Sequence, residues 1–326
     1  MKKVINETDG GNLRMIGVRD LKGATRIRRF QNSLPLYMMA LPCVAIVFVF
    51  NYIPMFGIFL SFKNYKFYEG VFGSAWVGIK NFEFFFKSGV AWRLIFNTVF
   101  LNMCFAFAVQ LLGIIVALLL NEIYQLKIAK LYQSVFFFPH FISWVIVGYF
   151  AYAFLNADNG LLNNVLVSLG KEPINWYSTP GVWPGILTTI ATWKGLGYFT
   201  IIYLAGMVSI NPEYYEALRL DGGNKIHEMH YITLPFIKPL IYTNVFMALG
   251  RVFYANFDFF NNVVRNTSQI MSTSDVIDTY VIRAITVTGD FNMAAAVGLI
   301  QGVCGLILIL FSNWIVRRID NENALF

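Results

Sequence analysis

The sequence predicts an all-α, polytopic membrane protein with six transmembrane helices. Of its 326 residues, 57% are hydrophobic and 13% are charged, whereas soluble domains usually contain roughly 25% charged residues. Six apolar runs reach the length of about 20 helical residues that is needed to cross a hydrocarbon layer of about 30 Å. The runs are continuously apolar and do not alternate, which favours helices over the strands of a barrel. They lie at residues 36–62, 94–120, 132–155, 183–210, 236–257 and 291–316.

The first apolar run is expected to stay in the mature protein. It is longer than the apolar part of a cleavable signal peptide. It also contains Pro42 and Pro54, and the polar residues 1–34 precede it. We therefore interpret it as the first span rather than as a targeting segment.

The distribution of Lys and Arg predicts the orientation. More than half of the 25 basic residues lie in segments that fall on one side of the membrane if six helices alternate. The positive-inside rule makes this side cytoplasmic, so both termini are expected on the cytoplasmic side of the cell membrane. The net charge of +7 beside a membrane span indicates contact with anionic lipid rather than with nucleic acid. The basic segments are residues 1–34, the second-to-third and fourth-to-fifth connections, and residues 317–326.

The connections on the outer side are expected at residues 63–93, 156–182 and 258–290. In the second of them, the apolar positions 161, 162, 165, 166 and 169 recur with helical spacing. This pattern predicts a short amphipathic helix at the outer membrane interface.

Three glycines in the last span are three or four residues apart and therefore share one helix face. Small residues on such a face let another helix approach closely, either within this chain or at a dimer seam. The three are Gly298, Gly302 and Gly305.

The polar connection at 211–235, between the fourth and fifth spans, predicts two short helices set at an angle. Residues 211–213, Asn-Pro-Glu, form a helix start, because Asn caps free amides, Pro suits the first turn and Glu favours the positive end of the helix dipole. The helix should end at 221–223, Asp-Gly-Gly, where glycine accepts a left-handed backbone. Asn224 can cap a second helix that runs to about Thr233, before the fifth span opens.

The same connection resembles a known motif. Residues 216–223 read Glu-Ala-Leu-Arg-Leu-Asp-Gly-Gly, with Ile232, Leu234 and Pro235 further on. This resembles the EAA motif, E-A-A-x-x-D-G-A followed by I-x-L-P, of permease subunits in binding-protein-dependent ABC importers. Leu218 and Gly223 stand where that motif has alanine.

The resemblance extends over residues 32–318. Segments 35–42, 76–82, 275–283 and 294–298 are similar to those of the LplB and YteP type of sugar permease in Gram-positive bacteria, within the maltose-permease superfamily. It implies the fold of a type I ABC importer permease. It also implies four kinds of partner: a second homologous permease that forms a heterodimer, two cytoplasmic ABC ATPase subunits, an extracellular solute-binding protein, and an oligosaccharide that alternating access carries across the membrane.

The family further implies that the 211–235 loop docks in a cleft of the ATPase subunit, with Glu216 and Asp221 holding its bend. The sequence lacks a G-x-x-x-x-G-K-[ST] phosphate loop. The chain is therefore expected not to be an enzyme, and ATP and magnesium would be bound by the partner ATPases. The implied coupling residues are Glu213, Glu216, Ala217, Asp221, Gly222, Gly223, Leu234 and Pro235.

The expected domain plan follows from the spans and the loop. Residues 1–34 form a basic cytoplasmic tail, and residues 35–92 contain the first transmembrane helix with an outer loop. Residues 93–316 form a permease core of five transmembrane helices, and residues 317–326 form a second cytoplasmic tail.

Ionisable residues inside the spans are costly, so each is a candidate functional residue. His140 is interpreted as a hydrogen-bonded packing residue, with a proton relay as the alternative. Lys194 and Arg251 each lie about 24 Å above the cytoplasmic end of their helices, at about 1.5 Å per residue. Two cations at one depth can line one cavity and favour an anion; alternatively, they snorkel outward or pair with acids of the partner.

Aromatic and polar residues near these two cations suit a sugar. Trp193, Tyr198, Phe253 and Tyr254 can stack on sugar rings, and Asn256 and Asp258 can bind hydroxyls. Together with the two cations they predict a pathway for an oligosaccharide, including an acidic one that contains uronates.

Three alternatives are weighed against this pathway: a metal site, a secondary transporter or channel, and an intramembrane enzyme. His227 and His230 have a spacing that can bind metal, but a third ligand at a fixed spacing is not apparent, so contact with the ATPase or water is expected instead. An ion-driven secondary transporter or a channel is the main alternative, since six spans with intramembrane charges suit either. An intramembrane enzyme would need a nucleophile and a base or metal ligands within reach, and the spans lack such a cluster.

Overall fold

The computed structural model describes residues 4–5, 15–16, 18–123 and 126–319. The chain divides into two compact units, Met1–Ile58 and Phe59–Phe326. Parts of the two expected tails, residues 1–3, 6–14, 17 and 320–326, lie outside the described residues.

The first unit is dominated by α1, Val18–Val47. Helix therefore begins inside the segment that was expected to be a polar tail. A π-helical stretch, Phe48–Tyr52, and a 3-10 helix, Ile53–Phe62, continue α1 into the second unit. The apolar stretch Ser33–Phe62 is long enough to span a membrane, and none of its most apolar window is buried within the chain. Two strands, β1 (Val4–Ile5) and β2 (Met15–Ile16), pair antiparallel.

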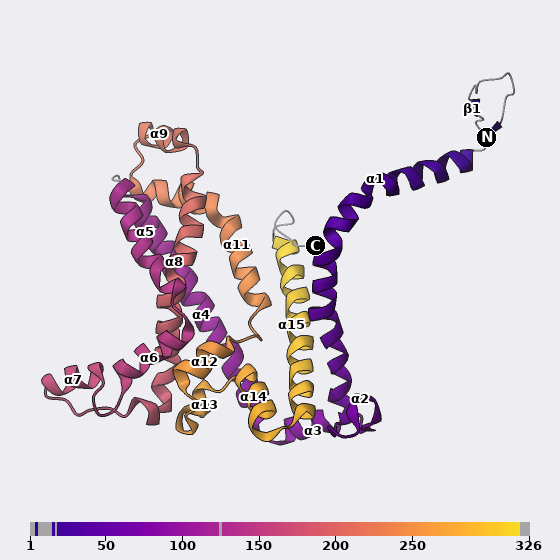
Figure 1. Cartoon of the computed structure of the whole chain (residues 1–326). Coiled ribbons are helices and arrows are strands. Elements are labelled where there is room, and N and C mark those ends of the chain that lie inside the picture. The colour runs from indigo at the N-terminus through magenta and orange to yellow at the C-terminus, as the bar shows by residue number, and fades with distance from the viewer. Residues whose placement is uncertain (1–3, 6–14, 17, 124–125, 320–326) are drawn as a thin grey trace. The chain divides into compact units, whose positions relative to one another are not determined.

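The second unit is a bundle of long apolar helices (Figure 1). Helix α8 packs along α4 and α5, and α11 packs against α15. Within the described part of the chain, four helices are long and apolar enough to cross a membrane, or up to six if each bent pair is one span. The helices of the bundle are α4 (Val90–Asn121), α5 (Leu126–Phe141), α6 (Trp144–Leu155), α8 (Trp183–Val208), α11 (Leu234–Gly250) and α15 (Phe291–Ile319).

Two of the predicted spans are not the single continuous helices that were expected. The run 132–155 is not one straight helix, because α5 and α6 meet at a bend of 97°. Pro139 lies inside α5, where a residue without an N–H weakens a helix, and Ser143 caps the new helix α6. The fifth span ends at Gly250 instead of residue 257, and residues 251–256 are not helical.

Short elements connect the long helices. The predicted amphipathic helix is confirmed as α7, Leu161–Ser168. Figure 1 shows α9 at one end of the second unit and α7, α13 and α14 at the opposite end. Strands β3 (Lys63–Asn64) and β4 (Ala75–Trp76) form an antiparallel hairpin. The other short helices are α2 (Gly70–Gly73), α3 (Lys80–Lys87), α9 (Pro212–Leu220), α10 (Lys225–His227), α12 (Phe257–Val264), α13 (Met271–Ser274) and α14 (Ile277–Arg283).

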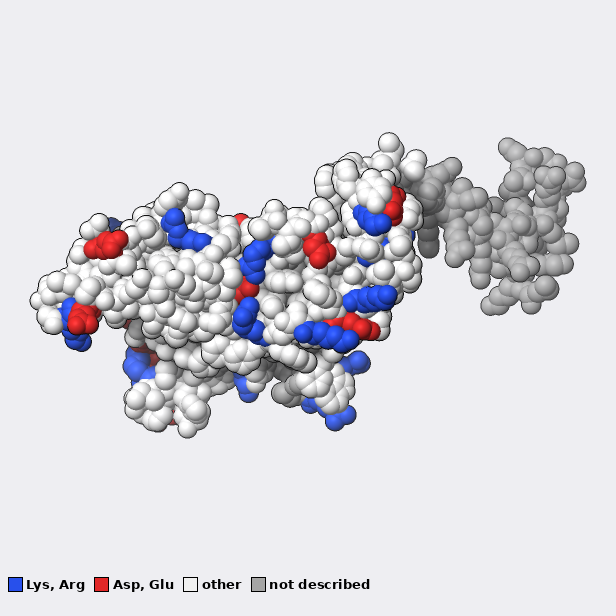
Figure 2. Space-filling model, turned by 90° about the horizontal axis from the view of Figure 1, so that it is seen from below, with Lys and Arg blue, Asp and Glu red and all other residues white. Residues whose placement is uncertain are grey.

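Figure 2 views the second unit from the end that carries α7, α13 and α14. Basic and acidic side chains lie interspersed there over a mostly uncharged surface. Beneath this end, a buried apolar cluster joins α6, the start of α8 and α12, with Trp183 and Phe260 almost fully enclosed. A second cluster joins α4, α8 and α11 around the buried Tyr203.

Candidate functional site

The first arm of the 211–235 loop is the helix α9. The Asn211 side chain accepts a hydrogen bond from the Glu213 amide at 3.1 Å, and Pro212 occupies the first turn. The helix ends at Leu220 with Asp221 as its C-cap, and Gly222 follows with φ of +81°. The predicted helix start and the predicted glycine stop are both confirmed.

The second arm begins at Asn224, as predicted, but it does not end at Thr233. The Asn224 side chain accepts from the amides of Ile226 and His227, and the Nδ1 atom of His227 accepts from the Asn224 amide. From Lys225 the helix continues without a break into the fifth span, as far as Gly250. Residues Glu228–Thr233 are π-helical, with the Leu234 amide donating to the Met229 carbonyl, and this wider turn leads into Pro235 without ending the helix.

The contacts that hold the two arms together differ from those expected. Glu216 and Asp221 are exposed, and the contacts across the bend come from other side chains. Arg219 of α9 donates to the buried carboxylate of Glu228 at 2.6 Å from Nε and 3.3 Å from Nη2. The Tyr215 hydroxyl lies 3.1 Å from the Thr233 hydroxyl. The one sequence signal for the Arg219–Glu228 contact was the pair of opposite charges on either side of Gly222 and Gly223.

Most of the predicted coupling residues face outward. Beside them Leu220 is 89% exposed, which is unusual for an apolar residue and leaves α9 with an unpaired apolar tip. Gly223 and Leu234 are half-buried, and Glu213, Glu216, Ala217, Asp221, Gly222 and Pro235 are exposed.

The break between α5 and α6 is held by Lys194 of α8. Its ammonium donates to the carbonyl oxygens of Pro139 at 3.1 Å, His140 at 2.8 Å and Ile142. The side chain also lies 5.1 Å from the ring of Trp144. Lys194 is 9% exposed, so in this conformation its charge caps a helix end and does not face open space.

Three more predicted residues, His140 of α5 and Trp193 and Tyr198 of α8, lie near this break. The imidazole of His140 stacks between the rings of Phe137 and Tyr198, at 5.4 and 5.3 Å. His140 is thus part of a ring stack that joins α5 to α8. Trp193 is 43% exposed and points to a different side of α8 from Lys194.

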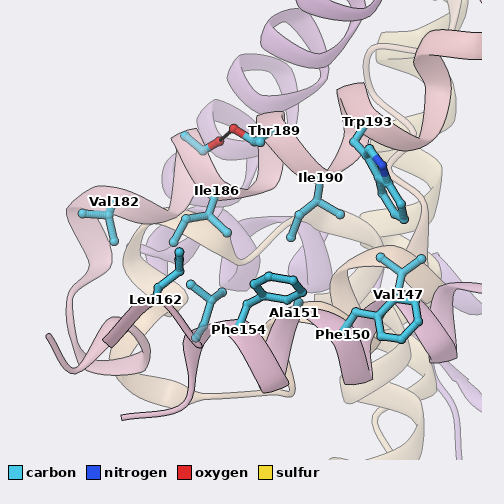
Figure 3. A pocket seen from close by; sticks show the side chains of 12 residues that line it. Val147, Phe150, Ala151, Phe154, Leu162, Val182, Ile186, Thr189, Ile190 and Trp193 are labelled. Atoms are coloured by element: carbon cyan, nitrogen blue, oxygen red, sulfur yellow. Dashed lines mark hydrogen bonds between the residues drawn. The ribbon is translucent and has the colours of Figure 1, made fainter. Parts of the chain in front are cut away.

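Trp193 lines a pocket of about 700 Å³ between α6, α7 and α8. Figure 3 shows side chains of α6 and α8 facing one another across it. Thr189 is the one hydroxyl in the lining, and it donates to the Gly185 carbonyl. Because sugar hydroxyls buried without partners are costly, this lining does not suit an oligosaccharide. The pocket is formed by Val147, Phe150, Ala151, Phe154, Leu155, Leu162, Val182, Gly185, Ile186, Thr189, Ile190 and Trp193.

The second break, residues 251–256, is held by polar side chains from three helices. Asn102 of α4 donates to the carbonyl oxygens of Val252 and Tyr254, at 2.9 and 3.4 Å. Gln301 of α15 donates to the Phe253 carbonyl at 2.7 Å and to Asp278 at 3.1 Å. Asp278 of α14 accepts from the Ala255 amide, and burial raises the pKa of its carboxyl, although these hydrogen bonds act in the opposite direction. Irregular backbone in a membrane protein is tolerated where such partners satisfy it.

Five predicted pathway residues lie on or next to this second break. Arg251, Tyr254, Asn256 and Asp258 are exposed, whereas Phe253 is half-buried and packs on the cluster around Phe85 and Leu94. The Asn256 side chain caps α12 by accepting from the Phe259 amide. The structure does not join this group to Lys194, whose ammonium is occupied by the other break.

The ring of Tyr254 lies over two of the three glycines of the last span. A Cβ atom at Gly305 would be 3.1 Å from this ring, and one at Gly302 would be 3.8 Å from its hydroxyl. These two glycines therefore make room for a side chain, where the approach of a helix was expected.

Comparison with known proteins agrees with this arrangement. Residues 110–322 match the family described as binding-protein-dependent transport system inner membrane component. The chain is 33% identical over 290 residues to the polygalacturonan/rhamnogalacturonan transport system permease protein YteP of Bacillus subtilis, covering 88% of this chain and 89% of that protein.

Solved structures agree as well. A chain of a bacterial ABC transporter involved in the import of the acidic polysaccharide alginate has a TM-score of 0.83 and 30% identity, covering 91% of this chain and 99% of that one. A second structure, of the bacterial alginate ABC transporter in complex with an alginate pentasaccharide-bound periplasmic protein, has a TM-score of 0.82 and 31% identity, covering 90% and 97%. The apolar helices and the similarity to these proteins lead to one conclusion. This chain is a multi-pass membrane protein that belongs to the family of binding-protein-dependent transport system inner membrane components.

Proposed function

We propose that this chain is one of two related permease subunits of an ATP-driven importer that carries an oligosaccharide across the cell membrane. In the assembly, two cytoplasmic ATPase subunits bind ATP and magnesium, and an extracellular solute-binding protein delivers the sugar. Both termini and α9 lie on the cytoplasmic side, in keeping with the Lys and Arg in the adjoining segments.

The exposed face of α9 is the observation that carries the ATPase part of this proposal. A polar helix with an exposed apolar tip at Leu220 has a surface that another protein can cover. The helix is joined to α8 by three residues and to the fifth span through Gly222 and Gly223, so a displacement of α9 acts on two spans at once. Closure of the ATPase subunits moves α9 and switches the bundle between inward and outward openings. An ion-driven carrier, the alternative function, has no use for such a surface.

The substrate part rests on the second break and on the relatives. YteP is named for polygalacturonan and rhamnogalacturonan transport, and both solved structures belong to alginate importers. Arg251 is an exposed cation on the 251–256 segment, beside the exposed Tyr254, Asn256 and Asp258. We propose that these residues contact an acidic, uronate-containing oligosaccharide. Phe253 and Lys194 then act indirectly, Phe253 by packing the second break against an apolar cluster and Lys194 by holding the first break. Trp193, which lines the apolar pocket, and Tyr198, which stacks on His140, take no part in this proposed contact.

Copurification tests the ATPase part directly. The tagged chain is expressed with its neighbouring permease and the candidate ATPase subunits, purified into nanodiscs and assayed for ATP hydrolysis and for uptake after reconstitution. The expected result is a complex that contains an ATPase and accumulates uronate oligosaccharides only with ATP. Accumulation driven by an ion gradient without a bound ATPase would show that the chain is a secondary transporter.

A further inference from the structure

The carboxylate of Glu228 is the most buried charge at the α9 end of the described bundle. Its side chain is 4% exposed, while the three charged side chains around it are 49 to 62% exposed. Arg219 donates from Nε to Oε1 and from Nη2 to Oε2, and the Lys225 ammonium lies 3.0 Å from the same Oε2. A buried carboxylate with a two-pronged Arg partner has a fixed geometry, whereas an exposed pair is free to separate.

Two more contacts lie along the same pair of helices. Tyr215 meets Thr233 through their hydroxyls, and the ring of Tyr214 lies 5.2 Å from that of Phe236. The contacts pair decreasing residue numbers of α9 (219, 215, 214) with increasing numbers of the helix that starts at Lys225 (228, 233, 236). The two arms are therefore held antiparallel over most of the length of α9.

The π-helical stretch lies between the first two of these contacts. It begins at Glu228 and ends at Thr233, and the Thr233 hydroxyl donates to the Glu228 carbonyl at 3.2 Å. Such stretches often mark functional positions in helices. Here the wider turn sets Glu228 and Thr233 toward α9.

One ion pair continues from these two arms to a different helix. Lys225 lies 2.8 Å from Glu122, which caps the end of α4. Helix α4 packs along α8. A continuous line of charges thus joins Arg219 of α9, Glu228, Lys225 and Glu122 of α4.

We propose that Glu228 is a positioning residue that makes α9 and the start of the fifth span one rigid body, and that Lys225 and Glu122 pass the displacement of this body to α4. This inference rests on the proposed function, since α9 must be driven by an ATPase. Without the Glu228 carboxylate, α9 still docks, but its motion is absorbed in the glycine turn and reaches the spans weakly.

The test measures coupling in the reconstituted complex, as oligosaccharide imported per ATP hydrolysed. Glu228→Gln and Arg219→Gln each remove one charge of the pair, the first at a buried and the second at an exposed side chain. The charge swap Arg219→Glu with Glu228→Arg restores the pair in reverse. Glu83→Gln, which breaks the exposed Lys87–Glu83 pair of α3, is the matched control.

We expect both single variants to keep the bound ATPase and its hydrolysis rate while import per ATP falls at least fivefold, and the swap to recover at least half of the loss. A smaller fall, of about twofold, is expected for Glu122→Gln. Unchanged import per ATP in both single variants overturns the inference, and so does loss of the ATPase from both, which would make Glu228 part of the docking surface. If the unmodified complex contains no ATPase, the proposed function itself fails.

Discussion

The ammonium of Lys194 lies 2.8 Å from the carbonyl oxygen of His140, across the interface between α8 and α5. The last carbonyls of a helix lack partners within it and carry the negative end of its dipole. A buried cation at this place compensates both effects, and Lys194 does so for three carbonyls at a bend of 97°. The sequence suggests Lys194 as a ligand for the substrate, but in the structure its ammonium group binds backbone carbonyls of its own chain.

Replacing Lys194 with Met should therefore weaken the fold more than it alters selectivity. The variant removes the Lys194 donor from the part-buried carbonyls of His140 and Ile142, whereas the Pro139 carbonyl keeps the amide of Ile142. An acceptor that is left without a partner away from water costs about 1–3 kcal/mol. The midpoint of thermal unfolding of the nanodisc complex should fall, with Lys130→Met, an exposed site on α5, unchanged. An unaltered midpoint, together with a lost preference for acidic over neutral oligosaccharides, would instead place Lys194 in the substrate pathway.

Replacing Arg251 with Gln should affect the uptake of acidic oligosaccharides and leave the uptake of neutral ones unchanged. Because Arg251 is exposed, its attraction for one carboxylate is modest, about 1 kcal/mol or about fivefold in KM. Uptake of uronate oligosaccharides should show this rise in KM, which salt diminishes, while uptake of neutral oligosaccharides stays the same. Lys238→Gln, an exposed cation near the start of α11, the helix that Arg251 follows, serves as the control. A KM for uronate oligosaccharides that is the same in Arg251→Gln as in the unmodified protein would contradict an acidic-sugar contact at this residue.

The turn at Gly222 should be sensitive to backbone geometry and insensitive to size. Its φ is +81°, and a Cβ atom there would meet nothing within 4 Å. Gly222→Ala should cost about 1–2 kcal/mol and reduce uptake, while Gly222→Asn should retain most of it because Asn tolerates this conformation. Gly222→Pro should abolish uptake with the protein still in the membrane, as measured by membrane fractionation and transport. Normal transport by Gly222→Pro would refute a rigid turn between α9 and the fifth span.

At the exposed Glu216, reversal of charge should interfere with docking and not with folding. Glu216→Lys is expected to abolish uptake and to lower the amount of ATPase that copurifies, at an unchanged level of the chain in the membrane. Glu69→Lys, at a half-buried residue of the connection that follows the first apolar stretch, provides the comparison. Full retention of ATPase and uptake in Glu216→Lys would exclude α9 as the docking site.

Leu218 and Gly223 should behave as a coupled pair. A Cβ atom at Gly223 would lie 2.6 Å from Cγ of Leu218 and 2.8 Å from its carbonyl oxygen, and both residues stand where the EAA motif has alanine. Gly223→Ala alone should lower transport and stability, and adding Leu218→Ala should recover part of the loss by opening space. A double-mutant cycle of thermal midpoints measures the coupling, which for contacting residues is about 0.5–3 kcal/mol. Strictly additive effects would mean that the two departures from the motif are independent.

The position of the Tyr254 ring should depend on Gly305. Gly305→Val pushes branched carbon atoms toward a ring that is already 3.1 Å from a Cβ position. If Tyr254 contacts sugar, the KM for the oligosaccharide should rise in this variant and in Tyr254→Ala alike, without a further rise when the two are combined. Gly298→Val, at a site with open space around it, is the matched control. A normal KM in Gly305→Val would show that Tyr254 does not contact the substrate.

Local features of the sequence determined a large part of this protein. The number of apolar runs, the helix α7 and both ends of α9 follow from hydrophobic length, periodicity and capping residues such as Asn211 and Gly222, and these signals act over a few neighbouring residues. The exposure of most EAA-like residues agrees with a polar loop between two spans. These features are encoded where they occur, so the order of residues is sufficient to find them.

Only the tertiary structure decided where the spans break and what holds the breaks. A hydrophobic run has the same composition whether it is straight or bent, and the bend at 142–143 is stable because Lys194, on another helix, satisfies the carbonyls that it exposes. In the same way, the fifth span stops at Gly250 because Asn102 and Gln301, distant in sequence, bind the freed backbone. Glu228 became identifiable through Arg219 and Lys225, whose charges come together only when α9 folds back. Polar groups removed from water must be paired, and the partners that pair them here come from other parts of the chain.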